Sequence, residues 1–365
     1  MFDIKYKKNR KDKPMEDIYI SKKRRNSGQF VVNLPDDPIE QMPPEDNEPP
    51  KPEKKKKKHK AFKRLIVVLL MIFLFVSSFI FVFAATSNYT RNDLERNEYV
   101  SPFELKSSPL VSNILLLGVD GNASSSSRSD SMILISVDYA HAKIKLTSFL
   151  RDSWVEIPSK GKKAKLNAAC SYGGPQLVVD TIEYNFGVDI DHYVMVDFNM
   201  FTQIIDKLGG VEVEVTQKEA KFINNTTRQN VDYGESVHLN GEEALVYCRI
   251  RKLDSDYMRT YRQRKVITAL INQAKRAGIS KLIETMQGVF PLIQTDMSPA
   301  EITALAYKAG IGMVAFKIEQ NRVPIDDHMK PSTVNGQWVE VLDTEATKEY
   351  LIDYIYSNKI KIDEE

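Results

Sequence analysis

The chain has 365 residues, which is long enough for one large or two ordinary domains, and 42% of them are hydrophobic. That content supports a sizeable core and excludes a chain that is disordered throughout. The net charge of +2 hides an asymmetry, because residues 1–64 carry 19 Lys and Arg against 11 Asp and Glu, whereas the remainder carries 32 against 38. A basic arm joined to a mildly acidic body indicates that the two parts face different surroundings.

Residues 1–64 are predicted to be a disordered basic segment. They contain two Pro-Pro pairs, clustered acids and blocks of lysine, with too little apolar content to offset the entropy cost of ordering. The lysine run at residues 54–58 could contact nucleic acid, but a basic run beside an apolar segment is more typical of contact with anionic lipid headgroups. We therefore expect no nucleic-acid partner.

Residues 65–85 form an uncharged apolar stretch of 21 residues. A helix of this length spans about 30 Å of hydrocarbon, so we predict a single transmembrane helix. The basic residues before it predict a cytoplasmic N-terminus and an extracellular remainder. A cleaved signal peptide is the alternative, but the length and depth of the stretch favour a retained anchor. Residues 86–108 would then be an extracellular linker.

Strand-like and helix-like segments alternate from residue 110 onward, which predicts an α/β fold with a central mixed β-sheet flanked by helices. Strands are expected at residues 114–119, 132–137, 144–149, 193–196 and 211–215. Helices are expected at residues 175–183, 201–208, 242–247, 257–277, 279–286, 299–309 and 344–356. We place the main folded domain at residues 109–320 and a C-terminal extension that packs on it at residues 321–365.

Charged residues gather where the first three expected strands begin or end. Asp120 follows the first strand, Arg128 and Asp130 precede the second, and Arg151 and Asp152 follow the third. Open α/β sheets place ligand sites at strand ends and in the adjoining loops. The pattern therefore predicts a site that combines carboxylates and guanidinium groups.

A second group of polar residues follows residue 248 and comprises Arg249, Arg251, Arg259, Arg262 and Gln263. The last three have the spacing i, i+3 and i+4 on the expected helix at residues 257–277, so they are predicted to share one face. Guanidinium forks bind phosphate oxygens bidentately, which makes this face a candidate phosphate site. On spacing alone, the alternative is a solvated ion-pair network with Asp152, Asp254 and Asp256.

Eight sequence blocks follow one another in the chain: NILLLGVD, RSDSMILISVD, SFLRDSWVEIP, KLNAACSYGG, DHYVMVDFNMF, IIDKLGGVEVEV, LNGEEALVYCRIRK and DSDYMRTYRQR. In this order they resemble the LytR-CpsA-Psr family of Gram-positive cell envelopes. The resemblance implies an extracellular phosphotransferase with its catalytic domain at residues 109–320. Such an enzyme transfers a glycopolymer with its phosphate from undecaprenyl pyrophosphate to peptidoglycan. Teichoic acid, capsule and other wall polysaccharides all remain open as the polymer.

The resemblance also implies roles for individual residues. Asp120 and Asp130 match the family's metal-binding acids, and Mg²⁺ or Mn²⁺ with retained waters suits two carboxylates. The matching pyrophosphate-binding positions are Arg128, Arg151, Arg249, Arg251, Arg259 and Gln263, with Arg262 as a weaker candidate. The residues that resemble the lining of a lipid pocket are Val178, Ile182, Phe198, Phe201 and Ile205.

The general base is open between two carboxylates, of which we expect Asp152 first and Asp256 second. Two other functions also remain open. One is a protein that binds polyprenyl-linked polymers or regulates wall synthesis without turnover, and the other is a lipid pyrophosphatase that uses water as the acceptor. Cys170 and Cys248 lie on the predicted oxidising side, so a disulfide and two buried free thiols are both open.

Overall fold

The computed structural model describes residues 89–120, 127–276, 287–312 and 315–357, together with residues 66, 71, 77, 78, 81, 82, 85, 86, 284 and 359. Residues from 66 onward belong to one structural unit, Lys60–Glu365. The predicted basic segment, most of the predicted membrane helix and nearly all of the helix expected at residues 279–286 lie outside the described residues. Across the described ranges, no helix is both long enough and apolar enough to cross a membrane.

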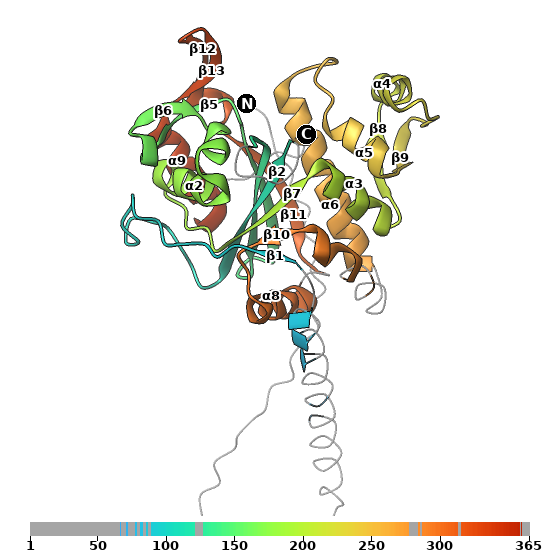
Figure 1. Ribbon diagram of the computed structural model, residues 1–365, viewed down its shortest axis with the longest axis horizontal. Coiled ribbons are helices and arrows are strands. Elements are labelled where there is room, and N and C mark those ends of the chain that lie inside the picture. The colour runs from blue at the N-terminus through green and yellow to red at the C-terminus, as the bar shows by residue number, and fades with distance from the viewer. Residues whose placement is uncertain are drawn as a thin grey trace, which may run out of the picture. The chain divides into compact units, whose positions relative to one another are not determined.

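Seven strands form the central sheet in the order β1-β10-β7-β2-β3-β4-β11 (Figure 1). They are β1 (Thr90–Arg91), β2 (Val111–Val119), β3 (Ser129–Asp138), β4 (Lys143–Phe149), β7 (His192–Asp197), β10 (Gln294–Thr295) and β11 (Lys317–Val323). Strands β2, β3 and β4 are consecutive and antiparallel, whereas β7 is parallel to β2 and β11 is parallel to β4. The mixed sheet expected from the sequence is confirmed.

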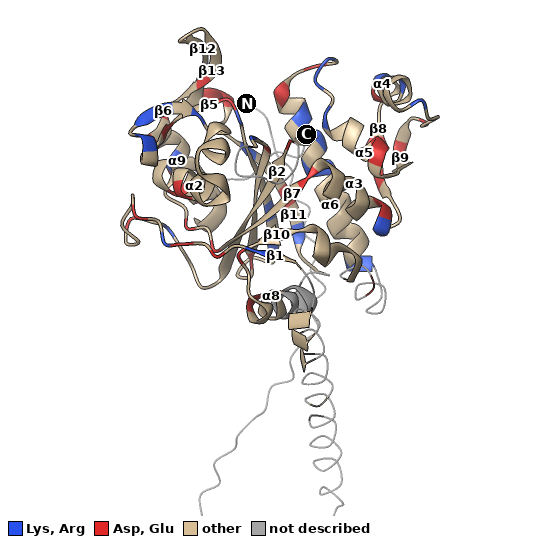
Figure 2. Cartoon of the chain, in the orientation of Figure 1, with Lys and Arg blue, Asp and Glu red and all other residues tan. Residues whose placement is uncertain are grey.

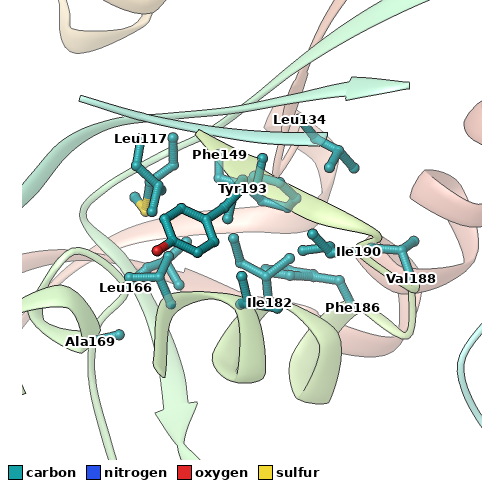
Figure 3. Close-up of a cluster of buried hydrophobic side chains, with 14 of the residues drawn as sticks. Leu117, Leu134, Phe149, Leu166, Ala169, Ile182, Phe186, Val188, Ile190 and Tyr193 are labelled. Carbon is teal, nitrogen blue, oxygen red and sulfur yellow. The ribbon is translucent and has the colours of Figure 1, made fainter. Parts of the chain in front are cut away.

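Helices cover both faces of this sheet. On one face lie α2 (Ala168–Phe186) and α9 (Thr344–Ile352), and on the other lies α6 (Asp256–Arg276) (Figure 1). Because side chains alternate along a strand, Leu115 and Leu117 pack with Phe186 in the large core under α2 (Figure 3). Their neighbour Leu116 packs with Ile267 of α6 in a separate cluster.

Helix α2 begins earlier than the predicted start at residue 175. Gly173 and Gly174 have non-helical dihedral angles, and Gly174 has a φ of +67°, so a first turn at Ala168 is joined to the main helix across a kink. Pro175 then stands where the helix resumes, which suits its fixed φ and missing N–H. Gly187 ends the helix in the left-handed conformation, with its N–H donating to the Glu183 carbonyl.

A further layer on the α6 side contains α3 (Phe198–Lys207), α4 (Gln217–Thr227), α5 (Gly241–Cys248) and the hairpin of β8 (Val211–Val215) and β9 (Gly234–Leu239). The sequence did not predict α4, although Thr216 and Glu219 form a capping box at its start. The helix expected at residues 299–309 is α8 (Pro299–Gly312).

A second sheet has four strands in the order β12-β13-β5-β6. They are β5 (Ser153–Ile157), β6 (Lys162–Lys165), β12 (Met329–Val334) and β13 (Gln337–Leu342). The boundary expected at residue 320 falls inside β11, which is a strand of the central sheet, and β13 pairs with β5. Residues 321–357 are therefore part of the same fold and not an extension packed on it.

The expected linker at residues 86–108 also contributes to the fold. Strand β1 pairs with β10. Asn97 is buried, and its side-chain amide donates to the Glu183 carboxylate at 2.9 Å and to the Asp180 carbonyl at 3.2 Å. The segment before residue 109 is thus attached to α2 by hydrogen bonds.

Candidate active site

A cavity of about 260 Å³ lies where β2 ends, β3 begins and the loop between α5 and α6 approaches them. Its lining consists of Gly118, Asp120, Asp130, Ser131, Phe198, Arg249, Arg251, Arg259 and Gln263. Basic residues follow α5, acidic residues precede and begin α6, and basic residues resume in its first turns (Figure 2). Most of the metal and pyrophosphate residues predicted from the sequence are therefore brought together around one space.

Close contact between β2, β3 and α6 fixes the floor of this cavity. A Cβ added to Gly118 would lie 3.1 Å from the Cβ of Ser131 on the neighbouring strand, so glycine allows that approach. The Ser131 hydroxyl donates to Oε1 of Gln263 at 3.0 Å. Arg259 and Gln263 are one helical turn apart, and both line the cavity.

Arg151 links the cavity to three carboxylates. Its Nη1 donates to Oδ1 of Asp130 at 2.8 Å, and its Nε lies 3.3 Å from Oδ2 of Asp152 and 3.7 Å from Oδ2 of Asp256. Burial lowers the pKa of Arg151, but the three carboxylates outweigh burial and the pKa is raised. The guanidinium therefore stays charged and is held at the edge of the cavity.

Asp256, the first residue of α6, lies among three arginines. Its carboxylate is 3.4 Å from Nε of Arg251 and 3.0 Å from Nη2 of Arg259. Burial raises the pKa of Asp256, although Arg151 and Arg251 act in the opposite direction. This carboxylate thus orients the arginines that line the cavity.

Asp152, the other candidate base, is buried and has a partner that the sequence analysis missed. Lys165 at the end of β6 donates from Nζ to Oδ1 of Asp152 at 2.7 Å. Lys165 belongs to the quoted block KLNAACSYGG, so its position beside the site could have been inferred from that block. The block gave no indication of which carboxylate it would meet.

The C-terminal hairpin also touches the site. The Tyr257 hydroxyl donates to Oε1 of Glu340 on β13 at 2.7 Å, and Glu340 is buried. Tyr257 follows Asp256 directly, so this bond ties the first turn of α6 to the four-stranded sheet. Burial and the hydrogen bond with Glu340 raise the pKa of Tyr257, so the hydroxyl remains a donor.

Besides Arg151, which contacts Asp130 but does not itself line the cavity, two predicted phosphate ligands are placed elsewhere. Arg262 is buried away from the cavity, where its guanidinium binds Glu219 at 2.6 Å, the Ile250 carbonyl at 3.2 Å and the carboxylate of Asp254. A helix turns by 100° per residue, so Arg262 points well away from Gln263. The expectation that Arg262 shares one face of the helix with Arg259 and Gln263 is therefore wrong. Arg128 is exposed and is not among the residues that line the cavity.

An apolar cavity of about 90 Å³ adjoins the polar one and shares Phe198, Arg249 and Gln263 with it. Phe198 and Phe201, two of the predicted lipid-pocket residues, line it. The Arg249 guanidinium lies 4.3 Å from the centre of the Phe198 ring, within the range of a cation–π contact. Phe198 therefore stands where the charged and apolar spaces meet.

The other three predicted lipid-pocket residues are not at this cavity. Val178 and Ile182 are fully buried in the core under α2, on the opposite face of the central sheet. Ile205 is fully buried in the core of the α3 and α5 layer. The sequence pattern marked all five residues as buried, but it did not separate ordinary core residues from residues that line a cavity.

The carboxylates at the cavity fit a hydrated cation better than a caged one. Asp120 and Asp130 line the same space, and Asp120 is exposed. Within the described ranges, no group of three or more His, Cys, Asp or Glu side chains is placed to hold a metal ion. Mg²⁺ usually keeps several waters and needs few protein ligands, so this donor set is compatible with it.

Cys170 and Cys248 are both buried free thiols. Cys170 belongs to the core under α2 and Cys248 to the core of the α3 and α5 layer. Burial raises the pKa of Cys170 to about 11 and that of Cys248 to about 12. The question left open by the sequence is thus decided against a disulfide between them.

Comparison with known proteins identifies relatives of this chain. A polyisoprenyl-teichoic acid–peptidoglycan teichoic acid transferase, TagU of Halalkalibacterium halodurans, is 36% identical over 189 residues, which cover 51% of this chain and 60% of that protein. The Bacillus subtilis transferase TagV, with the same description, is 35% identical over 219 residues, covering 58% of this chain and 54% of that protein. The chain therefore spans less than two thirds of the length of these two curated relatives.

A solved structure described as TagT bound to LIIa-WTA is similar with a TM-score of 0.60 and 26% identity, and the match covers 73% of this chain and 99% of that one. The model of the LytR_cpsA_psr family matches residues 77–352, which is more than half of the chain. The chain belongs to the LytR_cpsA_psr family.

Proposed function

We propose that this protein transfers a glycopolymer with its phosphate from a polyprenyl diphosphate carrier to peptidoglycan, forming a phosphodiester link. The observation that carries the proposal is the polar cavity, where Arg249, Arg251, Arg259 and two carboxylates surround a space that continues into an apolar one. A lipid diphosphate has the same two parts, a dense negative charge and an apolar chain. The names of the relatives as teichoic acid transferases support the same reaction.

The reaction requires little covalent chemistry from the protein. A hydroxyl oxygen of the acceptor attacks the phosphorus that carries the glycopolymer, and the bond from that phosphorus to the bridging oxygen breaks. Polyprenyl phosphate leaves with that oxygen, while the hydroxyl proton passes to a base. Phosphoryl transfer of this kind is catalysed mainly by positioning and by charge neutralisation. Arg249, Arg251 and Arg259, held in part by Asp256, provide both.

Asp120 and Asp130 are the residues that would hold Mg²⁺ or Mn²⁺. A bound cation would neutralise charge on the diphosphate oxygens. Asp130 also accepts a hydrogen bond from Arg151 at 2.8 Å, so the same carboxylate would align an arginine and a metal ion. Mn²⁺ binding to the full-length protein with and without a lipid diphosphate, followed by electron paramagnetic resonance, tests this assignment in wild type and Asp120→Asn.

We assign the general base to Asp152. Asp256 contacts three arginines, two of which line the cavity. Asp152, directly before β5, contacts only Arg151 among them, at 3.3 Å, and is oriented by Lys165. Burial raises the pKa of Asp256, which would also suit a base, so the two need a direct comparison. In Asp152→Asn we expect kcat to fall with the KM for the lipid donor nearly unchanged, whereas Asp256→Asn should raise that KM.

The proposal also places the folded part outside the cell membrane, with residues 65–85 as its anchor. The basic residues before that segment and the absence of charge within it support this topology. The membrane, the lipid-linked polymer and peptidoglycan are then the partners. Protease added to intact cells should digest the part after residue 86 and leave the N-terminal arm protected.

The decisive experiment uses the full-length protein in detergent with a polyprenyl-diphosphate-linked disaccharide, peptidoglycan oligomers and Mg²⁺. We expect Mg²⁺-dependent attachment of the sugar phosphate to the oligomer, and its loss in Asp130→Ala. Asp93→Ala is the matched control, since Asp93 pairs with Arg91 of β1 and is not among the residues that line the cavity. Tight lipid binding without transfer would favour the binding or regulatory alternative. Release of sugar phosphate to water regardless of oligomer would favour the pyrophosphatase.

A further inference from the structure

A transferase needs a place for its acceptor beside the donor. In the proposed function, the donor's diphosphate and lipid occupy the polar and apolar cavities between β2, β3, α5 and α6. The attacking and leaving oxygens lie roughly in line across the phosphorus, so the acceptor cannot enter through the space that the donor fills. Beyond Arg151 the site borders on the four-stranded sheet, because Asp152 leads directly into β5.

The two faces of that sheet differ. Val155, Ile157 and Ala164 point inward and are buried in the core under α2. The residues between them point outward, since side chains alternate along a strand. On this outward face, Trp154 of β5 is paired with Lys165 of β6 and with Val341 of β13.

One row of side chains crosses all four strands on the outward face. Val341 is paired with Lys330 of β12, so the row reads Lys330, Val341, Trp154 and Lys165. Lys330 is exposed, 36% of Val341 is exposed, and Trp154 is partly exposed. The row therefore presents an aromatic ring flanked by an aliphatic side chain and two lysines.

The row leads to the candidate base. Asp152 lies in the turn directly before β5, two residues before Trp154. The 2.7 Å bond from Lys165 Nζ to Asp152 agrees with this placement, because Lys165 is the cross-strand partner of Trp154. Lys165 thus connects the position of Trp154 with Asp152.

The chemistry of this face suits a peptidoglycan strand. A pyranose ring has an apolar face of C–H bonds that packs on the electron-rich face of an aromatic ring. Peptide stems carry carboxylates, and the exposed Lys163 and Lys330 supply positive charge on the outward face, where Glu156 is the acid of β5 and Lys165 is paired with Asp152. Figure 2 shows basic residues along β6.

We propose that the outward face of the four-stranded sheet, centred on Trp154, is the acceptor subsite, where a peptidoglycan glycan strand stacks with its reacting hydroxyl toward Asp152. The proposal rests on the proposed function for the identity of the acceptor. Binding of the strand to this face can nevertheless be measured without any transfer.

Tryptophan fluorescence provides that measurement, because the chain contains two tryptophans, Trp154 and Trp338. Trp338 is 50% exposed on β13 and, by strand alternation from Val341, lies on the other face. In the Trp338→Phe variant all tryptophan fluorescence comes from Trp154, and in the Trp154→Phe variant it all comes from Trp338. Titrating each full-length variant with peptide-bearing peptidoglycan oligomers should give a saturable change only in Trp338→Phe. A flat titration there, or the same change in both variants, overturns the proposal.

Kinetics provide a second test. Trp154→Ala should raise the KM for the oligomer about tenfold or more, because a stacking aromatic ring is lost, while the KM for the lipid donor holds. Trp154→Tyr should restore most of the acceptor affinity, and Trp338→Ala is the matched control. If wild type transfers the polymer but the KM for the oligomer is unchanged in Trp154→Ala, the acceptor subsite is wrong. The proposed function would still stand in that case. If wild type transfers nothing, the proposed function fails and the fluorescence titration alone decides the subsite.

Discussion

The central sheet has one face packed against α2 and another against α6, and the same strands supply both. Toward α2, β2 contributes Leu115 and Leu117 to a core in which both are fully buried. Toward α6, the same strand contributes Leu116, then Gly118, and finally Asp120 at the cavity. The face of β2 toward α2 is thus apolar along the strand. The face toward α6 is apolar at first and becomes charged near the cavity.

Strand β3 repeats the division. Met132 and Leu134 lie in the core under α2, whereas Ile133 faces α6 and Ser131 reaches the cavity. Alternation separates the two sets from Ser131 to Leu134, whereas Asp130, beside the register irregularity where Val119 pairs with Ser129, also lines the cavity. Substitutions on the two faces should therefore have different consequences, and the following predictions use that difference.

The largest effect is expected on the α6 side. Arg151→Ala should lower the transfer rate by about 10²–10³-fold, because a fixed guanidinium near the phosphates is lost and three carboxylates remain beside one another. Arg151→Lys keeps the charge without the fork and should recover only part of the rate. A rate in Arg151→Ala close to wild type, measured on folded protein, would contradict the placement of the site.

The next effect is expected in the core under α2. Phe186 is fully buried, and its ring centre lies 5.2 Å from that of Phe149, so Phe186→Ala should cost about 3–5 kcal/mol of unfolding free energy. Urea unfolding followed by circular dichroism measures this loss. Protein that remains folded at low temperature should transfer polymer at nearly the wild-type rate. A specific loss of kcat would show that the two faces are not separate.

Helix α6 contains both residues that line the cavity and residues that stabilise the fold, and Arg262 belongs to the second kind. Its guanidinium is 3% exposed and is paired with Glu219 and Asp254, so Arg262→Ala should cost about 3 kcal/mol by leaving buried charge unpaired. The KM for the lipid donor should stay within twofold or so of wild type, since Arg262 does not line the cavity. A large rise in that KM would indicate that Arg262 does bind the phosphates of the donor.

The smallest effect is a pH dependence that arises on α2. Burial raises the pKa of Glu183 from its ordinary 4.5 to about 7. Between these values the folded state holds a proton that the unfolded state has lost, so this group's contribution to stability declines as pH rises to about 7 and is constant above it. Glu183→Gln should remove this decline and flatten the dependence of unfolding free energy on pH in this range. Equal slopes of unfolding free energy against pH in both proteins would exclude this assignment.

Much of the fold could be predicted because local patterns and tertiary packing agree. The runs that became β2, β3 and β4 are apolar, short and bounded by turn residues, and the structure confirms them as strands. Helix α6 was expected from its apolar spacing, and it begins at Asp256, one residue before the expected start. Strands β6 and β12 were missed because they are short and carry lysine, proline and threonine in place of apolar runs. Strands β5 and β13 were also missed, although both are short segments that contain tryptophan, valine and glutamate.

The site was predictable in its charged residues and less so in its apolar ones. Asp120, Asp130, Arg249 and Arg251 do converge, since strand ends and motif blocks mark them. The direction in which each side chain points could not be predicted from the sequence blocks. Arg262 was misplaced because Glu219 and Asp254, its partners, lie in other elements. Tertiary partners of this kind become visible only once the elements are packed.

The position of β11 and β13 has a consequence for how the protein is made. Both strands come late in the chain, yet β11 pairs with β4 and β13 with β5, which are synthesised much earlier. Until those last strands emerge, β4 and β5 have exposed edges on that side, and such edges attract other chains. Contacts between distant segments also slow folding. A chain terminated before residue 317 would lack both β11 and β13, and the unpaired edges of β4 and β5 would make it an aggregation hazard.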